Sequence, residues 1–199
     1  MDMRAPEIYV LGIGHLAAAV RVQLSLFGLL PNRNCVDAHD TTRIVLACSD
    51  YVSTSSFADV NRRAIDDRWP ILFAWISDER IELGPLVVPL ESPCFECQPA
   101  RIWDFSLNEI TRRVVSSAPR TTLNPDTRLK SVAHLGALLV ARELTALRLG
   151  APESRLVGHV VKFDPPCVVP EVVEVTRAPD CPVCGGRVGE IPGTGDRRQ

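Results

Sequence analysis

Two C-x-x-C pairs constrain this chain more than any other feature of its sequence. Cys94 and Cys97 form the first pair, in Pro-Cys-Phe-Glu-Cys, and Cys181 and Cys184 form the second, in Asp-Cys-Pro-Val-Cys-Gly. Zinc in closed structural sites takes four thiolates at about 2.3 Å, which leaves no open position on the metal. The spacing therefore predicts one structural zinc ion that ties the end of the chain to its middle. A redox pair, a disulfide or coincidence would explain a single pair, but two pairs in one chain favour zinc.

The composition is that of a globular protein in a reducing compartment. Of 199 residues, 46% are hydrophobic and 23% are charged, and the net charge of −2 gives no basic footprint for nucleic acid. No apolar run reaches the length of a membrane span, and the N-terminus is not a signal peptide. Seven cysteines without an export signal indicate free thiols or metal ligands. We therefore expect a cytoplasmic protein that contacts neither nucleic acid nor membrane.

The three cysteines outside the pairs carry weaker expectations. Cys35 and Cys48 lie in apolar contexts and are expected to be buried free thiols, and Cys167 is the remaining candidate for an exposed thiol. The length allows one domain with a good core. We expect a single domain over residues 1–191 and a disordered tail over residues 192–199.

A glycine-rich turn follows the first apolar run. Residues 7–11 predict a short buried parallel strand, and Gly12-Ile13-Gly14-His15-Leu16-Ala17 opens a helix that extends to about Leu30. Strand, G-x-G-x-x-A and helix form the first turn of a nucleotide-binding Rossmann unit. In such a unit Gly12 makes the turn and Gly14 admits a phosphate close to the backbone. A tight turn with no ligand is the alternative interpretation.

The remaining pattern alternates strands and helices. A second buried strand over residues 43–48 ends at Ser49-Asp50, whereas Asp37, Asp40, His15 and His39 are interpreted as solvated or bystander groups. The fold class predicted is α/β, a Rossmann-like, mostly parallel sheet with a C-terminal antiparallel extension and a four-cysteine zinc site. The other expected elements are a helix over 53–68, strands over 70–76 and 81–90, a short helix over 108–115, an exposed loop over 116–125, a long helix over 128–149, and strands over 158–164 and 171–177.

This order of features resembles the ubiquitin-activating-type superfamily, the ThiF/MoeB adenylyltransferases. The resemblance rests on the G-x-G turn, the strand that ends in Ser-Asp, and the two cysteine pairs, and it extends from residue 7 to residue 186. Members adenylate the C-terminal carboxylate of a small protein or peptide with ATP and magnesium. By this resemblance, Gly12 and Gly14 would lie under the phosphates, and Asp50 would be the magnesium-binding aspartate.

The chain departs from that family in the nucleotide site. The ribose and phosphate groups normally found between the G-x-G turn and the aspartate would fall within residues 15–49, and this segment contains no lysine. A degenerate site of this kind is similar to the ThiF-like proteins of azole-forming peptide clusters, which support a YcaO-type cyclodehydratase that uses the ATP. The first strand begins near residue 7, so we expect no N-terminal winged-helix segment for leader binding, and another chain would have to supply it.

Three functions follow as hypotheses. The first is a non-adenylating scaffold that presents a precursor peptide to a YcaO-type enzyme, within a homo- or hetero-oligomer. The second is an active ATP-dependent adenylyltransferase with a shortened site, in which a partner subunit could supply the missing cations. The third, a nicotinamide enzyme, rests on G-x-G-x-x-A alone and lacks a ribose-binding acid at the required spacing.

Overall fold

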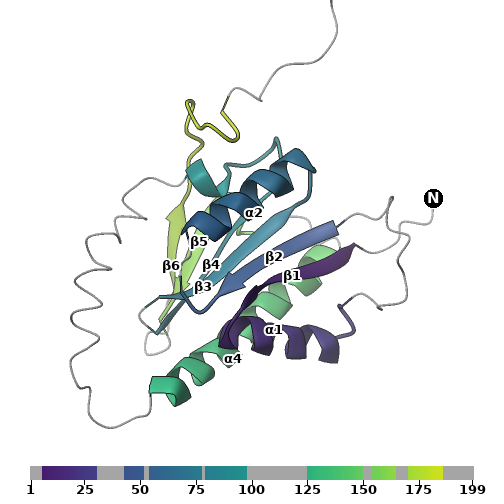
Figure 1. The fold of residues 1–199 in the computed structure, drawn as a ribbon, viewed down its shortest axis with the longest axis vertical. Helices are drawn as coiled ribbons and strands as arrows, with labels where there is room; N and C mark the ends of the chain where they lie inside the picture. The colour runs from purple at the N-terminus through teal and green to yellow at the C-terminus, as the bar shows by residue number, and fades with distance from the viewer. Residues whose placement is uncertain are drawn as a thin grey trace, which may run out of the picture.

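The structure is a computed structural model that describes residues 6–30, 43–51, 54–77, 79–97, 125–149, 154–164 and 170–185. Its sheet has six strands in the order β1-β2-β3-β4-β5-β6 (Figure 1). The elements are β1 (Glu7–Ile13), α1 (His15–Leu26), β2 (Arg43–Ser49), α2 (Thr54–Asp66), β3 (Ile71–Ser77), β4 (Arg80–Val87), the 3₁₀ turn η1 (Phe95–Cys97), α4 (Pro125–Arg148), β5 (His159–Phe163) and β6 (Glu171–Glu174).

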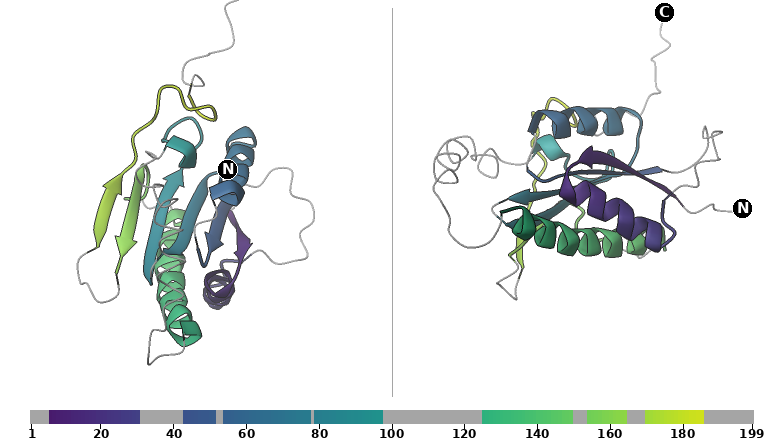
Figure 2. Two further views of the ribbon diagram at one scale, coloured as in Figure 1. Left: turned by 60° about the vertical axis from the view of Figure 1, so that its left-hand side comes forward. Right: turned by 60° about the horizontal axis from the view of Figure 1, so that its bottom comes forward.

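The sheet changes direction at β3. β1 pairs with β2 and β2 pairs with β3 in parallel, whereas β4, β5 and β6 continue the sheet in antiparallel pairs. α1 and α4 cover one face of the sheet, and α2 and η1 cover the other (Figure 2). Strands covered on both faces are nearly continuous in apolar residues, and all seven residues of β3 are buried, six of them apolar. The predicted α/β class, with its antiparallel C-terminal extension, is confirmed.

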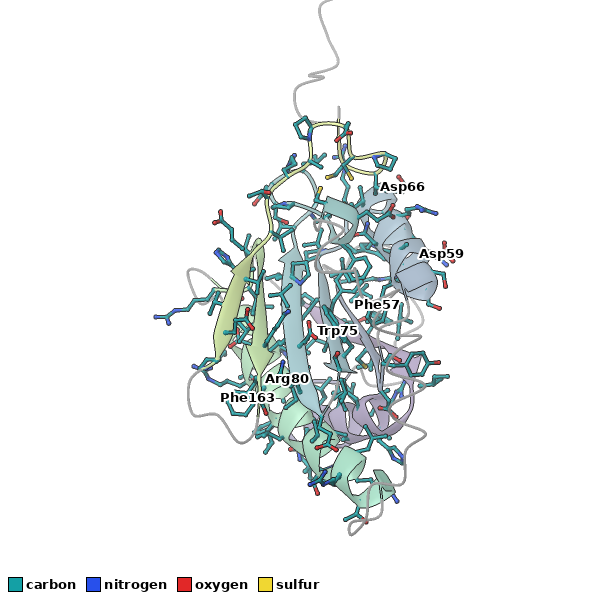
Figure 3. The ribbon with its side chains drawn as sticks, turned by 90° about the vertical axis from the view of Figure 1, so that its left-hand side faces the viewer. Phe57, Asp59, Asp66, Trp75, Arg80 and Phe163 are labelled. Atoms are coloured by element: carbon teal, nitrogen blue, oxygen red, sulfur yellow. The ribbon has the colours of Figure 1, made fainter. Side chains whose placement is uncertain are left out.

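Each face of the sheet packs its own core. The core between the sheet and helices α1 and α4 is aliphatic, and it includes Ile8 and Leu46 of the strands and Leu144 of α4. The face toward α2 carries an aromatic core, in which Phe57 of α2 packs on Trp75 of β3 (Figure 3). The aromatic core adjoins the loops that carry the cysteine pairs, so the region around those cysteines rests on the buried centre of the sheet.

Four predicted boundaries are wrong by three or four residues. The strand predicted to reach Leu90 ends at Val87, and the helix predicted from Arg128 begins at Pro125. The other two have a local reason. The helix predicted to reach Leu30 ends at Leu26, because Gly28 takes φ +62° and its N–H donates to the Ser25 carbonyl at 3.0 Å. This left-handed residue closes the helix. The strand predicted to reach Arg177 ends at Glu174, because Glu174 pairs with His159, the first residue of β5, and no partner strand remains beyond it in the described part of the chain. Residues 108–115 and most of the predicted loop that follows lie outside the described ranges.

β1 is less buried than its sequence predicts. Ile8 is fully buried against the aliphatic core, but Leu11 is 46% and Ile13 76% exposed on the opposite face. On the outer edge of the strand, the guanidinium of Arg21 from α1 donates to the carbonyls of Val10 (3.2 Å) and Gly12 (3.0 Å). Within the described ranges no strand pairs with this edge.

Among the described helices, none is long and apolar enough to cross a membrane.

Candidate metal centre and the helix N-terminus beside Asp50

The four paired cysteines converge at one end of the aromatic face. The Sγ atoms of Cys94 and Cys97 are 3.8 Å apart, those of Cys94 and Cys181 are 3.6 Å apart, and those of Cys97 and Cys184 are 3.1 Å apart. All four sulfurs lie within 4.8 Å of one another, and all four residues are buried. Four sulfurs at about 2.3 Å from one zinc ion would be about 3.8 Å apart, so the arrangement fits a tetrahedral thiolate site. The sulfurs are free rather than disulfide-bonded.

Each pair is shaped by a tight backbone turn. In the first, η1 brings the Cys97 N–H within 3.0 Å of the Cys94 carbonyl. In the second, the Gly185 N–H donates to the Cys181 carbonyl at 2.8 Å. A β-carbon at position 185 would lie 2.5 Å from that carbonyl oxygen, so the turn requires glycine there. Each turn therefore directs its two sulfurs to the same side.

The first turn is fixed to α2 and to the aromatic core. The Phe95 N–H donates to Oδ1 of Asn61, a fully buried residue of α2, at 3.2 Å. The Phe95 ring stacks on Phe73 with centroids 4.4 Å apart. Beside it, Arg62 forms an ion pair with Glu96 at 3.1 Å. The metal ligands are thus attached to the sheet through the residue that lies between them.

Burial and local hydrogen bonds shift the pKa values of the paired cysteines in different directions. Burial raises the pKa of Cys94 far above its ordinary range, while the side-chain amide of the nearby Asn61 acts in the opposite direction. Burial also raises the pKa of Cys184 to about 11, whereas for Cys181 the backbone N–H groups of Cys184 and Val183 outweigh burial and lower the pKa to about 7. Buried thiols of this kind lose their protons when a metal binds, because the ion offsets the charge.

Asn61 supplies a further reason to expect a metal here. Its Nδ2 is buried and has no hydrogen-bond partner within the normal distance limits. An unsatisfied buried donor costs about 1–3 kcal/mol. A metal-bound thiolate at Cys94 would accept a hydrogen bond from it, as groups around metal ligands commonly do. Zinc binding by the four cysteines remains a prediction, and this orphaned donor is consistent with it.

A second cluster lies at the carboxyl ends of β1 and β2. Asp50 follows β2, and its two carboxylate oxygens accept hydrogen bonds from the backbone N–H groups of His15 and Leu16, both at 2.7 Å. These N–H groups are the first of α1, where the helix carries its partial positive charge. Gly14 takes φ +96°, and a β-carbon there would collide with the Asp50 carboxylate. The structure thus brings together Gly12, Gly14 and Asp50, the three residues predicted for a nucleotide site.

Gly12 lies close against β2. It pairs with Cys48 across the two strands, and a β-carbon at position 12 would collide with the Cys48 carbonyl. Cys48 is fully buried and free, as predicted, and burial raises its pKa to about 12. Cys35 and Cys167 lie outside the described ranges. Whether Gly12, Gly14 and Asp50 hold ATP and magnesium remains a prediction.

Sequence reasoning missed Asn61 and Arg21. Asn61 lies on the inner side of α2 beside Ala64 and Ile65, and a lone polar residue on an apolar helix face is a signal of a buried partner. Arg21 lies among the apolar residues of α1, and nothing in the sequence indicates that its side chain returns to the β1 carbonyls.

Comparison with known proteins supports the fold. No family model matches the sequence, and no curated protein matches it. Among solved structures, the chain is similar to Escherichia coli MccB (TM-score 0.68, 15% identity, 97% of this chain and 69% of that chain). It is also similar to the heterocyclase TruD, with a TM-score of 0.65 and 20% identity over 93% of this chain and 28% of that chain. A heterocyclase in complex with substrate and cofactor gives a TM-score of 0.65 and 17% identity over 93% of this chain and 26% of that chain. This likeness is one of fold, and it confirms the ThiF/MoeB-like architecture expected from the order of motifs.

The chain spans only about a quarter of the length of the two heterocyclases. Their chains therefore contain much that the present sequence does not cover.

Proposed function

We propose that this chain is a non-adenylating component of ribosomal peptide natural-product biosynthesis. In this role it presents a precursor peptide to a YcaO-type cyclodehydratase, which carries out the ATP-dependent chemistry. The setting is supported by the structural neighbours, which are heterocyclases and MccB, one of them in complex with MccA.

The contact between Asp50 and the start of α1 carries the non-adenylating part of the proposal. In nucleotide-binding folds the first N–H groups of this helix bind phosphate. Here the N–H groups of His15 and Leu16 bind both oxygens of a carboxylate that belongs to the chain itself. A phosphate at this position would have to displace Asp50 or share the site with a like charge. Each hydrogen bond to a charged group contributes about 1.5–3 kcal/mol, so displacement would weaken nucleotide binding considerably.

The positive charge described near this turn is already engaged. Phosphate groups need positioned cations to offset their charge. Residues 15–49 contain no lysine, and the guanidinium of Arg21 is bonded to the carbonyls of Val10 and Gly12. This arrangement of the described residues supports a non-adenylating role. The four-cysteine centre would act as a structural clamp, and the peptide and the partner would bind elsewhere on the surface.

The decisive experiment is reconstitution. The purified, zinc-loaded chain is combined with a YcaO-type enzyme and a precursor peptide from the same gene cluster, and heterocycle formation is followed by mass spectrometry. Loss of one water per ring is expected only when this chain is present. A YcaO-type enzyme that is fully active without the chain would show that the proposed role is wrong.

An active adenylyltransferase is the second candidate. It is favoured by the positions of Gly14 and Asp50, because an acid at a strand end that faces a helix N-terminus can also hold magnesium on a triphosphate. One MccB neighbour was solved with ATP. The test is carboxylate-dependent exchange of pyrophosphate into ATP. Exchange by the wild-type chain that disappears in Asp50→Ala would favour this candidate over the scaffold role.

A further inference from the structure

The segment that leads to the second cysteine pair lies against the loop that leads to the first. β6 ends at Glu174, and the chain then runs toward Cys181 and Cys184 as the yellow part of the ribbon in Figure 3. Val175, the first residue after β6, is buried in the same cluster as Cys94 and Cys181. The two halves of the metal centre are therefore neighbours before either cysteine pair is reached.

One guanidinium joins these two segments. Nη2 of the half-buried Arg177 donates to the carbonyl of Ser92 at 2.8 Å and to the carbonyl of Leu90 at 3.1 Å. Hydrogen bonds from a charged donor are about twice as strong as those between neutral groups. Arg177 precedes Cys181 by four residues, and Ser92 precedes Cys94 by two. The contact therefore joins the two chain segments at a point close to both cysteine pairs.

The loop that accepts these bonds is held in a defined shape by its own contacts. Ser92 is buried, its hydroxyl accepts the Val88 N–H at 2.8 Å, and its backbone N–H donates to the Val88 carbonyl at 3.0 Å. Leu90 takes φ +72°, a conformation that a leucine keeps only where surrounding contacts fix it. Both carbonyls thus have fixed positions, and Arg177 binds them from the other segment.

The segment that carries Arg177 is itself attached to the sheet. The Val175 N–H donates to the carbonyl of Gly158, next to the start of β5, at 2.7 Å. Gly158 takes φ +68°, and a β-carbon there would lie 3.6 Å from Cδ of Pro93 in the loop before the first pair. Val175, Gly158 and Pro93 therefore lie close together, and Arg177 extends from a fixed base.

We infer that Arg177 is a positioning residue of the metal centre, which holds the second cysteine pair at the separation from the first that one metal ion requires. The Cys181 N–H donates to the Ala178 carbonyl at 3.1 Å, so the backbone fixed at Arg177 continues directly into the second turn. Holding two ligand groups together raises their effective concentration for a shared partner. The inference rests on zinc binding by the four cysteines and is independent of the proposed role in peptide modification.

The test is the zinc affinity of Arg177→Leu, measured by competition with a chromophoric chelator. Leucine keeps part of the aliphatic stem but donates no hydrogen bond. Zinc should bind at least about tenfold more weakly, a loss typical when groups that orient metal ligands are removed. It should also pass faster to excess chelator. If Arg177→Leu does not fold, Arg177→Gln is measured in its place with the same expectation. Wild-type affinity in the folded variant would overturn the inference.

Arg80→Leu is the matched control. Arg80 also joins segments that are far apart in the sequence, through an ion pair with Asp164 at 3.1 Å, but it lies at the other end of β4 from the cysteines (Figure 3). Zinc affinity and release rate should stay at the wild-type values in this variant, even if its melting temperature falls. A loss of affinity as large as that of Arg177→Leu would point to general loss of stability and would overturn the inference.

Two comparisons separate positioning from charge. A zinc ion with four thiolates carries a net negative charge, which a nearby cation would stabilise without positioning anything. Arg177→Lys restores a cationic donor and should bind zinc more tightly than Arg177→Leu; equal affinities would contradict the inference. In about 1 M salt, which screens charges more than about 3 Å apart, the difference between the wild type and Arg177→Leu should persist. Its disappearance would assign the effect to charge and overturn the inference.

The zinc content of the wild type separates this inference from the assignment of the metal. A wild-type chain that binds no zinc overturns both. One equivalent of zinc in the wild type, bound with the same affinity by Arg177→Leu, overturns the role of Arg177 alone. One equivalent in the wild type, with weaker binding in Arg177→Leu and unchanged binding in Arg80→Leu, is the expected result.

Discussion

A β-carbon on Gly14 would collide with the carboxylate of Asp50, so the two residues share this turn only because position 14 is glycine. In a nucleotide-binding turn the same glycine keeps space for a phosphate. Here that space is filled by an aspartate whose two oxygens bind the first N–H groups of α1. The turn therefore has the geometry of the motif, but the anionic group bound at it is a side chain of the protein itself.

The first prediction concerns this contact. Gly14→Ala should destabilise the fold by more than the roughly 1–2 kcal/mol that a left-handed alanine costs, because its φ +96° and ψ −172° are open essentially only to glycine and the methyl group would displace Asp50. Gly28→Ala is the matched control, since Gly28 has φ +62° and a methyl group there would meet nothing within 4 Å. Thermal unfolding should show a clearly larger fall in melting temperature for Gly14→Ala. Equal falls would mean that the Asp50 contact contributes nothing.

The second prediction concerns anion binding. Asp50→Ala should cost about 0.5–2 kcal/mol as a lost helix cap and should expose the N–H groups of His15 and Leu16. Inorganic phosphate is then expected to raise the melting temperature of the variant but not that of the wild type. The contrary result, equal stabilisation of both proteins, would show that Asp50 does not block an anion site.

The third prediction concerns the metal. One equivalent of zinc per chain is expected, and it should be lost in Cys181→Ser but retained in Cys48→Ala. The metal would close a loop over residues 98–180, a constraint comparable to a long-loop disulfide at about 3–5 kcal/mol. A strong chelator should therefore lower the melting temperature by at least about 6 °C, with function lost only in step with unfolding. Loss of function without loss of stability would indicate a catalytic metal.

The fourth prediction concerns Asn61. Asn61→Asp keeps the acceptor for the Phe95 N–H but replaces the buried Nδ2 donor with an oxygen near Cys94. Zinc affinity, measured by competition with a chromophoric chelator, should fall about tenfold or more, as for other groups that orient metal ligands. The thiolate-to-cobalt absorption bands of the cobalt-substituted protein should also shift. Unchanged affinity and spectrum would leave Asn61 with only its role in positioning Phe95.

The fifth prediction concerns thiol reactivity. Burial raises the pKa of Cys48 to about 12, so at pH 8 only about one thiol in 10⁴ is ionised. Since the thiolate is the reactive form, iodoacetamide should not label Cys48 in the folded protein at pH 8, but should label it after denaturation. Peptide mapping gives the site. Rapid labelling of Cys48 in the native protein would contradict the buried position.

Local patterns predicted the parts of this structure that are governed by local geometry. The cysteine spacing indicated which four sulfurs would converge, and the family resemblance indicated that Gly14 and Asp50 would belong to one site. The geometry of each cysteine pair depends on a turn of a few residues. The buried run of β3 was also predictable, because a strand covered on both faces is nearly continuous in apolar residues.

Features set by distant contacts were not predictable. The exposed side chains of Leu11 and Ile13 belong to an apolar run that looks like a buried strand, and only the arrangement of α2 over β2 and β3 reveals that one face of β1 is open. Whether Asp50 binds the first N–H groups of α1 depends on the exact distance between the end of β2 and the start of that helix, which the sequence does not give. Similarly, the role of Asn61 exists only once α2 lies over η1.

The two hydrogen bonds from Arg21 to the β1 carbonyls have a consequence for colloidal behaviour. An unpaired strand edge can template the addition of strands from other molecules, which leads to fibrils and precipitation. A charged side chain that occupies the carbonyls of Val10 and Gly12 makes such growth costly, since each incoming strand would first have to break both bonds. Arg21 thus acts as a gatekeeper for the sheet, and it lets the chain expose an aliphatic surface on β1 at high concentration without polymerising along that edge.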